Sequence, residues 1–214
     1  MDPLQIFTIV TIVMFVVLAI ITLFISINKR TLFAKLEGLI EQGKFDEFFK
    51  RIDSPMTRLV YPDYNRTYFK LNAYMMKGDY KAANTVLDDL LSRKTSSEQR
   101  ADLVVKAFNI YISLNKAKKA KAMLDEIDQL EDAKYSSAKE DCRMMYDIAI
   151  LKKSNYIDQM ERALDKMSGP ARGRLEYLLA LQYQNRGDMA KRNEYLNRSS
   201  RAMREAMGGD TEAK

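Results

Sequence analysis

A run of 25 residues without a charged side chain, Leu4 to Asn28, lies near the start of this 214-residue chain. At about 1.5 Å per residue, a helix of this length crosses the ~30 Å hydrocarbon core of a bilayer. The few Thr and Ser hydroxyls in the run can bond to the backbone of their own helix. The run is longer than the roughly 7–15 residues of a signal-peptide core, and Met1-Asp2-Pro3 before it is not basic. We therefore expect residues 1–30 to form an uncleaved transmembrane anchor that contacts membrane lipid.

The charges beside the apolar run predict its orientation. Lys29, Arg30 and Lys35 follow it, whereas only the α-amino group and Asp2 precede it. Basic flanks stay in the cytoplasm. We therefore expect a single-pass protein of the bacterial cell membrane, with the N-terminus outside and the chain from about residue 31 onward in the cytoplasm. The alternative places the same domain outside the membrane.

The composition argues against most kinds of catalytic site. The chain has no histidine and one cysteine, Cys142, which excludes His-based triads, His-ligated zinc and an internal disulfide. Glycine-rich phosphate loops and nucleophile elbows are also missing from the sequence. We expect no catalytic residue, no metal and no cofactor, and a protein that is not an enzyme. Cys142 is interpreted as a small packing residue.

The rest of the chain carries a repeat. Five Gly or Asn residues, which readily take the left-handed conformation that ends a helix, follow one another at spacings of 35, 37, 40 and 32 residues. Apolar or Tyr residues stand four and seven residues before each site, and two and nine residues after it. This pattern predicts antiparallel helical hairpins that must stack to bury their faces. The five sites are Gly43, Gly78, Asn115, Asn155 and Gly187.

The repeat predicts the helix boundaries. The expected pairs cover residues 31–42 and 44–53, 63–77 and 79–93, 97–114 and 116–130, 137–153 and 156–167, and 171–186 and 188–206. Residues 54–62, with two prolines, should break the first pair from the second. The segment from Asn28 to Lys35 has no Gly or Pro, which favours a helix that continues from the anchor. We expect a repeat domain over 31–206 and a disordered tail over 207–214.

Three helix starts have recognisable signals. The patterns Thr95-x-x-Glu98 and Ser137-x-x-Glu140 predict capping boxes. Pro170, two residues after Ser168, predicts a helix whose first turn contains proline.

The stretch LNAYMMKGDYKAANTVL, from Leu71 to Leu87, combines Tyr74, the turn Gly78-Asp-Tyr80 and the small Ala83. It resembles the tetratricopeptide repeat (TPR). The resemblance implies an all-α fold in which the transmembrane helix is followed by an α-solenoid of about five antiparallel hairpins. Departures from the family pattern are the missing Trp and terminal Pro, and the replacement of the small second-helix residue by Phe48, Met160 and Arg192.

The same resemblance implies a binding groove. In TPR domains the first helix of each pair lines a concave groove that holds a peptide, so a protein or peptide partner is expected. Asn72 and Asn109 take equivalent places, and an Asn side chain can bond a peptide backbone through donor and acceptor. The alternative is that these polar side chains only keep an empty groove hydrated. The matched positions are Asn65, Tyr68, Asn72, Met75, Lys106, Asn109, Ile112, Met145, Lys152, Arg174, Tyr177 and Gln184.

The net charge of +6 comes from 35 cations and 29 anions. Its densest cluster is Lys116, Lys118, Lys119 and Lys121. We interpret this cluster as a solvated outer face with alanines turned inward, and we expect no nucleic-acid partner because aromatic residues do not interleave with the lysines.

Together these features predict a membrane-anchored scaffold or adaptor. The alternative is an extracytoplasmic, chaperone-like factor that assists exported or membrane proteins. The apolar run has no GxxxG motif to indicate lateral packing of helices, and the oligomeric state is left open.

Overall fold

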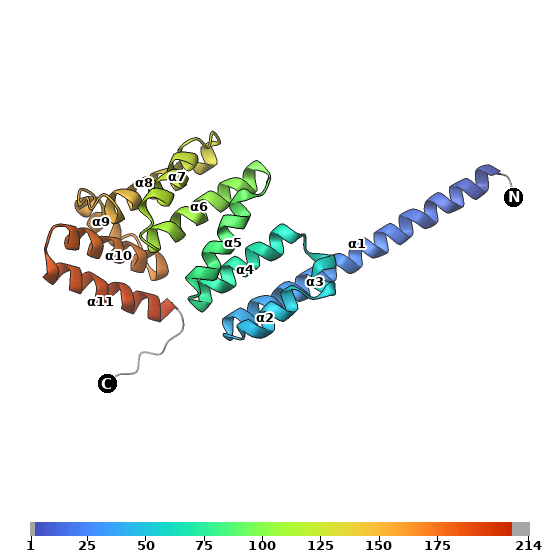
Figure 1. The fold of residues 1–214 in the computed structure, drawn as a ribbon, viewed down its shortest axis with the longest axis horizontal. Coiled ribbons are helices and arrows are strands. Elements are labelled where there is room, and N and C mark those ends of the chain that lie inside the picture. Colours follow the sequence, from blue (N-terminus) through green and yellow to red (C-terminus); the bar gives the residue numbers. More distant parts are fainter. Residues whose placement is uncertain (1–2, 207–214) are drawn as a thin grey trace. The chain divides into compact units, whose positions relative to one another are not determined.

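The structure is a computed structural model that describes residues 3–206; the tail expected to be disordered, 207–214, lies outside the described residues. The described residues form helices joined by turns, without a strand (Figure 1). In chain order the helices are α1 (Pro3–Glu41), α2 (Phe45–Ile52), α3 (Pro55–Val60), α4 (Asp63–Lys77), α5 (Tyr80–Ser92), α6 (Ser97–Ser113), α7 (Ala117–Asp128), the 3₁₀ turn η1 (Ala133–Tyr135), α8 (Ser136–Ala149), α9 (Ile157–Leu164), α10 (Gly169–Asn185) and α11 (Met189–Ala206).

The chain divides into two compact units, Met1–Lys94 (unit 1) and Thr95–Lys214 (unit 2). In unit 1 the helix α1 continues without a break past residue 30, as the absence of Gly and Pro from this segment favours. Its last turns pack against α2 and α3, α2 packs against α4, and α4 packs against α5. The core of this unit consists of Leu32, Leu36, Phe48, Ile52, Val60, Tyr61 and Ala73.

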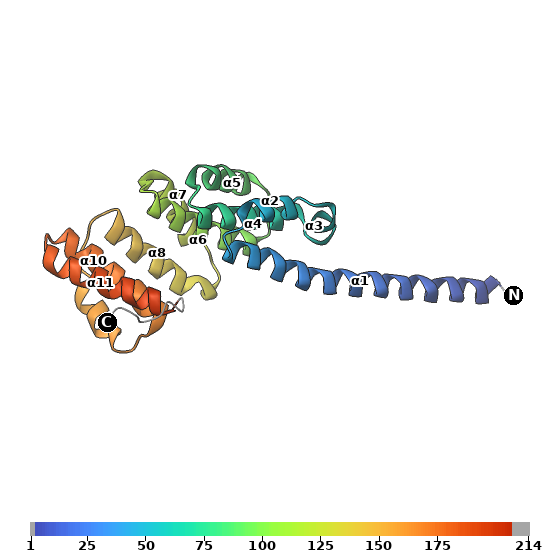
Figure 2. The same ribbon diagram turned by 90° about the horizontal axis from the view of Figure 1, so that it is seen from below.

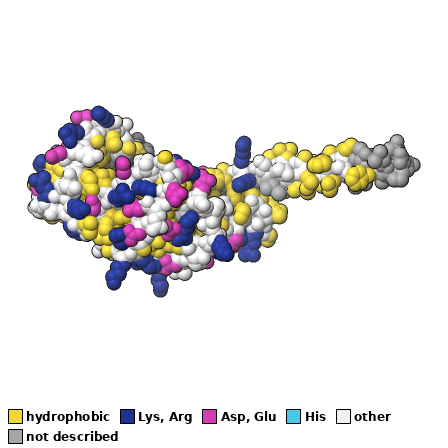
Figure 3. Space-filling model, turned by 90° about the horizontal axis from the view of Figure 1, so that it is seen from above, with side chains coloured by type: hydrophobic (Ala, Val, Ile, Leu, Met, Phe, Trp, Pro, Cys, Tyr) yellow, Lys and Arg dark blue, Asp and Glu magenta, His cyan; other side chains and the backbone are white. Residues whose placement is uncertain are grey.

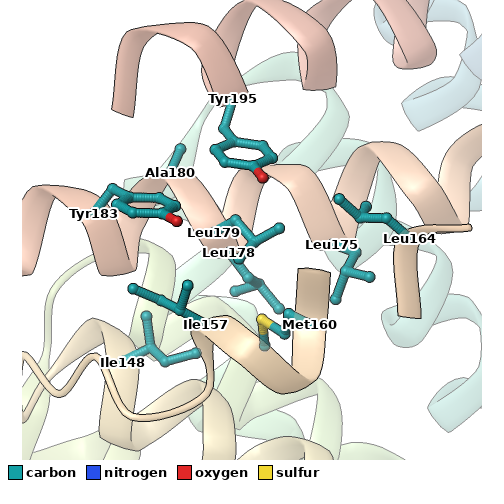
Figure 4. Packing of buried hydrophobic residues seen from close by; sticks show 10 residues of the cluster. All are labelled: Ile148, Ile157, Met160, Leu164, Leu175, Leu178, Leu179, Ala180, Tyr183 and Tyr195. Carbon is teal, nitrogen blue, oxygen red and sulfur yellow. The ribbon is translucent and has the colours of Figure 1, made fainter. Parts of the chain in front are cut away.

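In unit 2 the hairpins α6–α7 and α10–α11 each pack two successive helices together, and α6 contacts α8, which in turn contacts α10. Helix α9 packs against α10. Apolar side chains from α8, α9, α10 and α11 form the core shown in Figure 4, where the rings of Tyr183 and Tyr195 lie stacked at 5.5 Å. Both units are therefore built from helices that cover one another's apolar faces.

Four of the five predicted turn residues are confirmed. Gly43, Gly78, Asn115 and Gly187 have φ angles of 69°, 77°, 52° and 80°. At each turn, the amide of the next residue donates to the carbonyl four residues before the turn, at 2.8–3.0 Å. The residues seven before the five predicted sites are all at most 2% exposed: Leu36, Leu71, Phe108, Ile148 and Ala180.

The fifth prediction, a turn at Asn155, is wrong. Helix α8 ends at Ala149, and the left-handed residue is Lys152, with a φ of 56°. Asp147 explains the early end, because its carboxylate accepts from the Lys153 ammonium at 2.9 Å and from the Tyr156 hydroxyl at 2.6 Å. These bonds draw the connecting segment over the last turn of α8 and leave Leu151, expected to face inward, 51% exposed.

The predicted apolar stripe also fails at two places. Tyr80 and Met189, two residues after their turns, are exposed instead of packed.

Two cap predictions are wrong as well. The capping box at α6 is formed by Ser96 and Gln99, one residue beyond the predicted Thr95–Glu98 pair. Helix α8 begins at Ser136 directly after η1, so the Ser137 side chain does not cap it. The proline in the first turn of α10 is confirmed. The segment 54–62 was expected only to break the chain, but it contains α3, which starts at the pair Ser54-Pro55.

Candidate functional site

The first candidate site is the apolar half of α1. The described side chains from Ile12 to Leu23 are exposed, and in the described part of the chain one helix, Thr11–Glu41, is long and apolar enough to cross a membrane. Its mean hydropathy reaches 2.6, and none of the residues that the structure describes buries that stretch. Figure 3 shows yellow, apolar side chains along this projecting helix and dark blue cations near its base. An uncovered apolar surface of this length is typical of a contact with a membrane or with another protein.

Three threonine hydroxyls of this helix bond within it, and two of them, on Thr11 and Thr22, belong to the apolar run. Thr11, Thr22 and Thr31 each donate to the carbonyl four residues earlier, at 2.8, 2.8 and 3.2 Å. A hydroxyl bonded in this way has its donor satisfied within the helix. It therefore avoids the free-energy cost of an unsatisfied donor in the hydrocarbon core. These polar residues are therefore compatible with a membrane environment.

The end of the apolar run is fixed to the rest of unit 1. The Tyr61 hydroxyl donates to the Lys29 carbonyl at 2.8 Å, and the Lys29 ammonium lies 5.7 Å from the centre of the Tyr61 ring. Phe69 of α4 contacts the rings of both Tyr61 and Phe33, with ring centres 5.5 and 5.7 Å apart. Burial raises the pKa of Tyr61, so its hydroxyl stays a donor. These contacts hold α1 at a set angle to α3 and α4.

The second candidate site is the set of predicted groove residues, of which some lie in unit 1 and the others in unit 2. In unit 1, its residues Asn65, Tyr68, Asn72 and Met75 all lie on α4, spaced three or four apart, so they share one face of the helix. All four are half-buried, and Tyr68 stacks on Tyr64 with ring centres 6.2 Å apart. This face of α4 combines amide, aromatic and thioether groups.

In unit 2 the predicted groove residues lie on α6, α8 and α10, which contact one another in that order. We call this set the unit 2 face. Tyr177 is 46% exposed, and burial lowers the pKa of Lys106. The Asn109 amide nitrogen donates to the Val105 carbonyl of its own helix at 2.9 Å, which uses one of its two N–H donors. The face consists of Lys106, Asn109 and Ile112 on α6, Met145 on α8, and Arg174, Tyr177 and Gln184 on α10.

Lys152 lies apart from these helices. It follows the end of α8, and its ammonium donates to the Ala149 carbonyl at 2.7 Å. A cation in this place compensates the free carbonyls at a helix C-terminus. The structure therefore gives Lys152 a capping role that the sequence pattern did not indicate.

Sequence analysis also missed a buried ion cluster in unit 2. Glu176 of α10 is 2% exposed and pairs with Arg172 and Arg198, each at 3.1 Å. Arg172 also donates to the Leu164 carbonyl at 3.0 Å. These residues border an open pocket of about 560 Å³ between α10 and α11. Both arginines bond to the carboxylate, so the cluster has a structural role. Arg172 links α10 to the end of α9, and Arg198 links α10 to α11.

A second network in the same unit surrounds Glu161. Its carboxylate accepts from the hydroxyls of Tyr183 and Tyr195, at 2.6 and 2.9 Å. The hydrogen bond from Tyr183 is the main cause that lowers the pKa of Glu161. The network links α9 to α10 and α11 and leaves the carboxylate ionised, in a structural role.

Cys142 is buried, and burial raises the pKa of its thiol to about 11. A thiol with this pKa is almost entirely protonated at neutral pH and is a poor nucleophile. This agrees with the interpretation of Cys142 as a packing residue.

The lysine cluster at the start of α7 has local partners. Lys119 lies 5.2 Å from the centre of the Tyr111 ring, and Lys121 pairs with Asp125. Ala120, between them, is fully buried. The prediction that alanine turns inward and lysines outward is confirmed at this position.

No known protein family matches the chain, and no curated protein matches it. Among solved structures it is similar to BtubC (BKLC) from P. vanneervenii, with 15% sequence identity and a TM-score of 0.51. The similarity covers 86% of this chain and 83% of that one. At this identity the similarity shows the fold alone, an all-helical chain with helical hairpins.

Proposed function

We propose that this protein is a membrane-anchored, TPR-like scaffold or adaptor that binds a protein or peptide partner through the first helices of its hairpins. The observation that supports this most directly is α1, whose uncovered apolar half continues without a break into a folded unit of packed helices. A chain of this kind holds a binding face at a membrane surface. Tethering raises the local concentration of a partner, so weak binding is sufficient.

The unit 2 face supports the binding part of the proposal. Tyr177, Arg174 and Gln184 are exposed along one side of α10, and exposed Tyr and Arg are enriched at protein interfaces. The amide, aromatic and cationic groups of this face suit a peptide backbone and its carboxylates.

Photo-crosslinking in cells tests the binding part. A photo-reactive residue replaces Tyr177 on the unit 2 face, and a matched control replaces the exposed Lys118 on α7. We expect a discrete protein adduct from position 177 and none from position 118. Equal capture at both positions, or capture at 118 alone, contradicts binding through this face.

The orientation of the protein needs its own test. The exposed cations Lys29 and Arg30 follow the apolar run, which favours a cytoplasmic domain. Met76, 63% exposed at the end of α4, is replaced by cysteine, while the buried Cys142 gives little background. We expect a membrane-impermeant maleimide to modify Met76→Cys only after the inner membrane is permeabilised. Modification before that step would favour the extracytoplasmic alternative.

A further inference from the structure

The short helix α3 has two distinct faces. Its inner face, with Thr57 and Val60, is buried, and the Thr57 hydroxyl donates to the Arg51 carbonyl at 2.6 Å. Its outer face carries two large apolar side chains three residues apart, Met56 and Leu59, which are 39% and 67% exposed. The helix is therefore held firmly while an apolar face stays uncovered.

The exposed face of α3 lies beside the end of the apolar run. Helix α3 contacts α1, and Tyr61, directly after α3, bonds to the carbonyl of Lys29, the first charged residue after the apolar run. Within unit 1, α3 lies beside α1 where its projecting half begins (Figures 1 and 2). The exposed face of α3 thus lies at the level where an apolar run that crosses a bilayer leaves the hydrocarbon.

Three cations lie around this place, and the carboxylates nearest in sequence before and after α3, Asp53 and Asp63, are each paired with two cations. Lys29, Arg30 and Arg58 are all exposed. Asp53, the carboxylate nearest in sequence before α3, is paired with Lys70 at 2.8 Å and with Arg66 at 3.5 Å. Apolar side chains next to Lys and Arg are typical of segments that lie in the headgroup layer of a membrane, and cations there attract anionic lipids.

We propose that α3 is an interfacial membrane contact: Met56 and Leu59 insert at the boundary between headgroups and acyl chains, and Lys29, Arg30 and Arg58 engage anionic phospholipid headgroups. The inference rests on the proposed membrane anchor. A single helix leaves the attached domain free to rotate about the helix axis. A second contact beside it fixes which side of unit 1 faces the bilayer.

Depth-dependent fluorescence quenching tests the inference on the full chain in vesicles of phosphatidylcholine and phosphatidylglycerol. An environment-sensitive dye is attached to a single new cysteine at one of three positions, and the vesicles carry nitroxide-labelled lipids. Leu59→Cys probes α3, Met76→Cys is the matched exposed apolar control in the same unit, and Ile20→Cys probes the anchor. All three native residues are exposed, so the substitutions leave the core intact.

We expect strong quenching at position 20. Shallow nitroxides should quench the dye at position 59 at least about twofold more strongly than the dye at position 76. In vesicles of phosphatidylcholine alone, quenching at position 59 should be weaker. Quenching at 20 with equal signals at 59 and 76 overturns the interfacial contact and leaves the anchor standing. Quenching at 59 that does not change with lipid charge overturns the role of the cations. No quenching at 20 overturns the membrane anchor itself and the inference with it.

Discussion

Replacing Val16, Leu18 and Ile20 together by arginine is expected to remove the protein from the membrane fraction. The three side chains are exposed near the middle of the apolar run. Val16 and Ile20, four residues apart, share one side of α1, and Leu18 lies on the opposite side. An arginine near the centre of a membrane helix costs roughly 2.5–3.5 kcal/mol on insertion scales, so three cost about 9 kcal/mol. Arginine is a good helix former, so the change acts on insertion and leaves the helix itself intact. The measurement is the share of protein that resists alkaline extraction of membranes.

The matched control changes the same positions to other apolar residues, Val16→Leu, Leu18→Ile and Ile20→Leu. This variant should remain resistant to extraction. If the arginine variant also stays in the membrane fraction, α1 is not the anchor, and its apolar side chains must instead be covered by a partner protein. The proposed function would then lose its transmembrane anchor and keep its binding face.

The turns show which parts of the fold the sequence pattern predicts well. Gly43, Gly78 and Gly187 are recognisable because a left-handed residue after an amphipathic helix is a local requirement. The turn expected at Asn155 was wrong because its position depends on tertiary hydrogen bonds from Asp147 to Lys153 and Tyr156. Local propensity does not encode such bonds.

Helix α3 was missed for a different reason. Two prolines in nine residues indicate a break, but the first follows Ser54, whose hydroxyl accepts from the Thr57 amide at 3.4 Å. Serine followed by proline is also a signal for a helix start. A chain break and a helix start are both predicted from neighbouring residues alone. The packing of Thr57 and Val60 against the rest of unit 1 decides in favour of the helix.

The candidate site was predictable to a similar extent. Residues spaced three or four apart on one helix share a face by geometry alone, which places Asn65, Tyr68 and Asn72 together. The burial of Glu176 depends on Arg198, 22 residues away on another helix. Gly173 illustrates the same limit, because an added Cβ would lie 3.3 Å from Ala202, Met203 and Ser199 of α11. Close approaches of this kind follow from the packed structure.

Replacing Phe48 by alanine is expected to destabilise unit 1 by about 3–5 kcal/mol. Phe48 is fully buried among Leu36 and Ile52 and meets the Phe49 ring edge-on at 5.3 Å. It stands five residues after its turn, where the later hairpins have the fully buried Ala83 and Ala120. The first pair therefore has a ring where the second and third pairs have a methyl group, and alanine at position 48 leaves a cavity.

The readout is hydrogen exchange of peptides from α2 and from residues 32–41 of α1, in the full chain in detergent micelles. Exchange in both segments should become much faster in Phe48→Ala, whereas the exposed Lys50→Ala on the same helix serves as the control and should leave it unchanged. A loss below about 1 kcal/mol would contradict the packing of α1 against α2, since a fully buried ring cannot be removed at so small a cost.

The two largest predictions also separate the anchor from the fold. Phe48→Ala leaves the apolar half of α1 untouched, so the variant should stay in the membrane fraction even while α2 exchanges freely. The arginine variant should show the opposite result, with slow exchange in α2 and no membrane attachment. Helix α1 is one continuous helix. These outcomes together would show that its two halves have different roles: residues before about 29 contact lipid, and residues after about 31 pack in the core of unit 1.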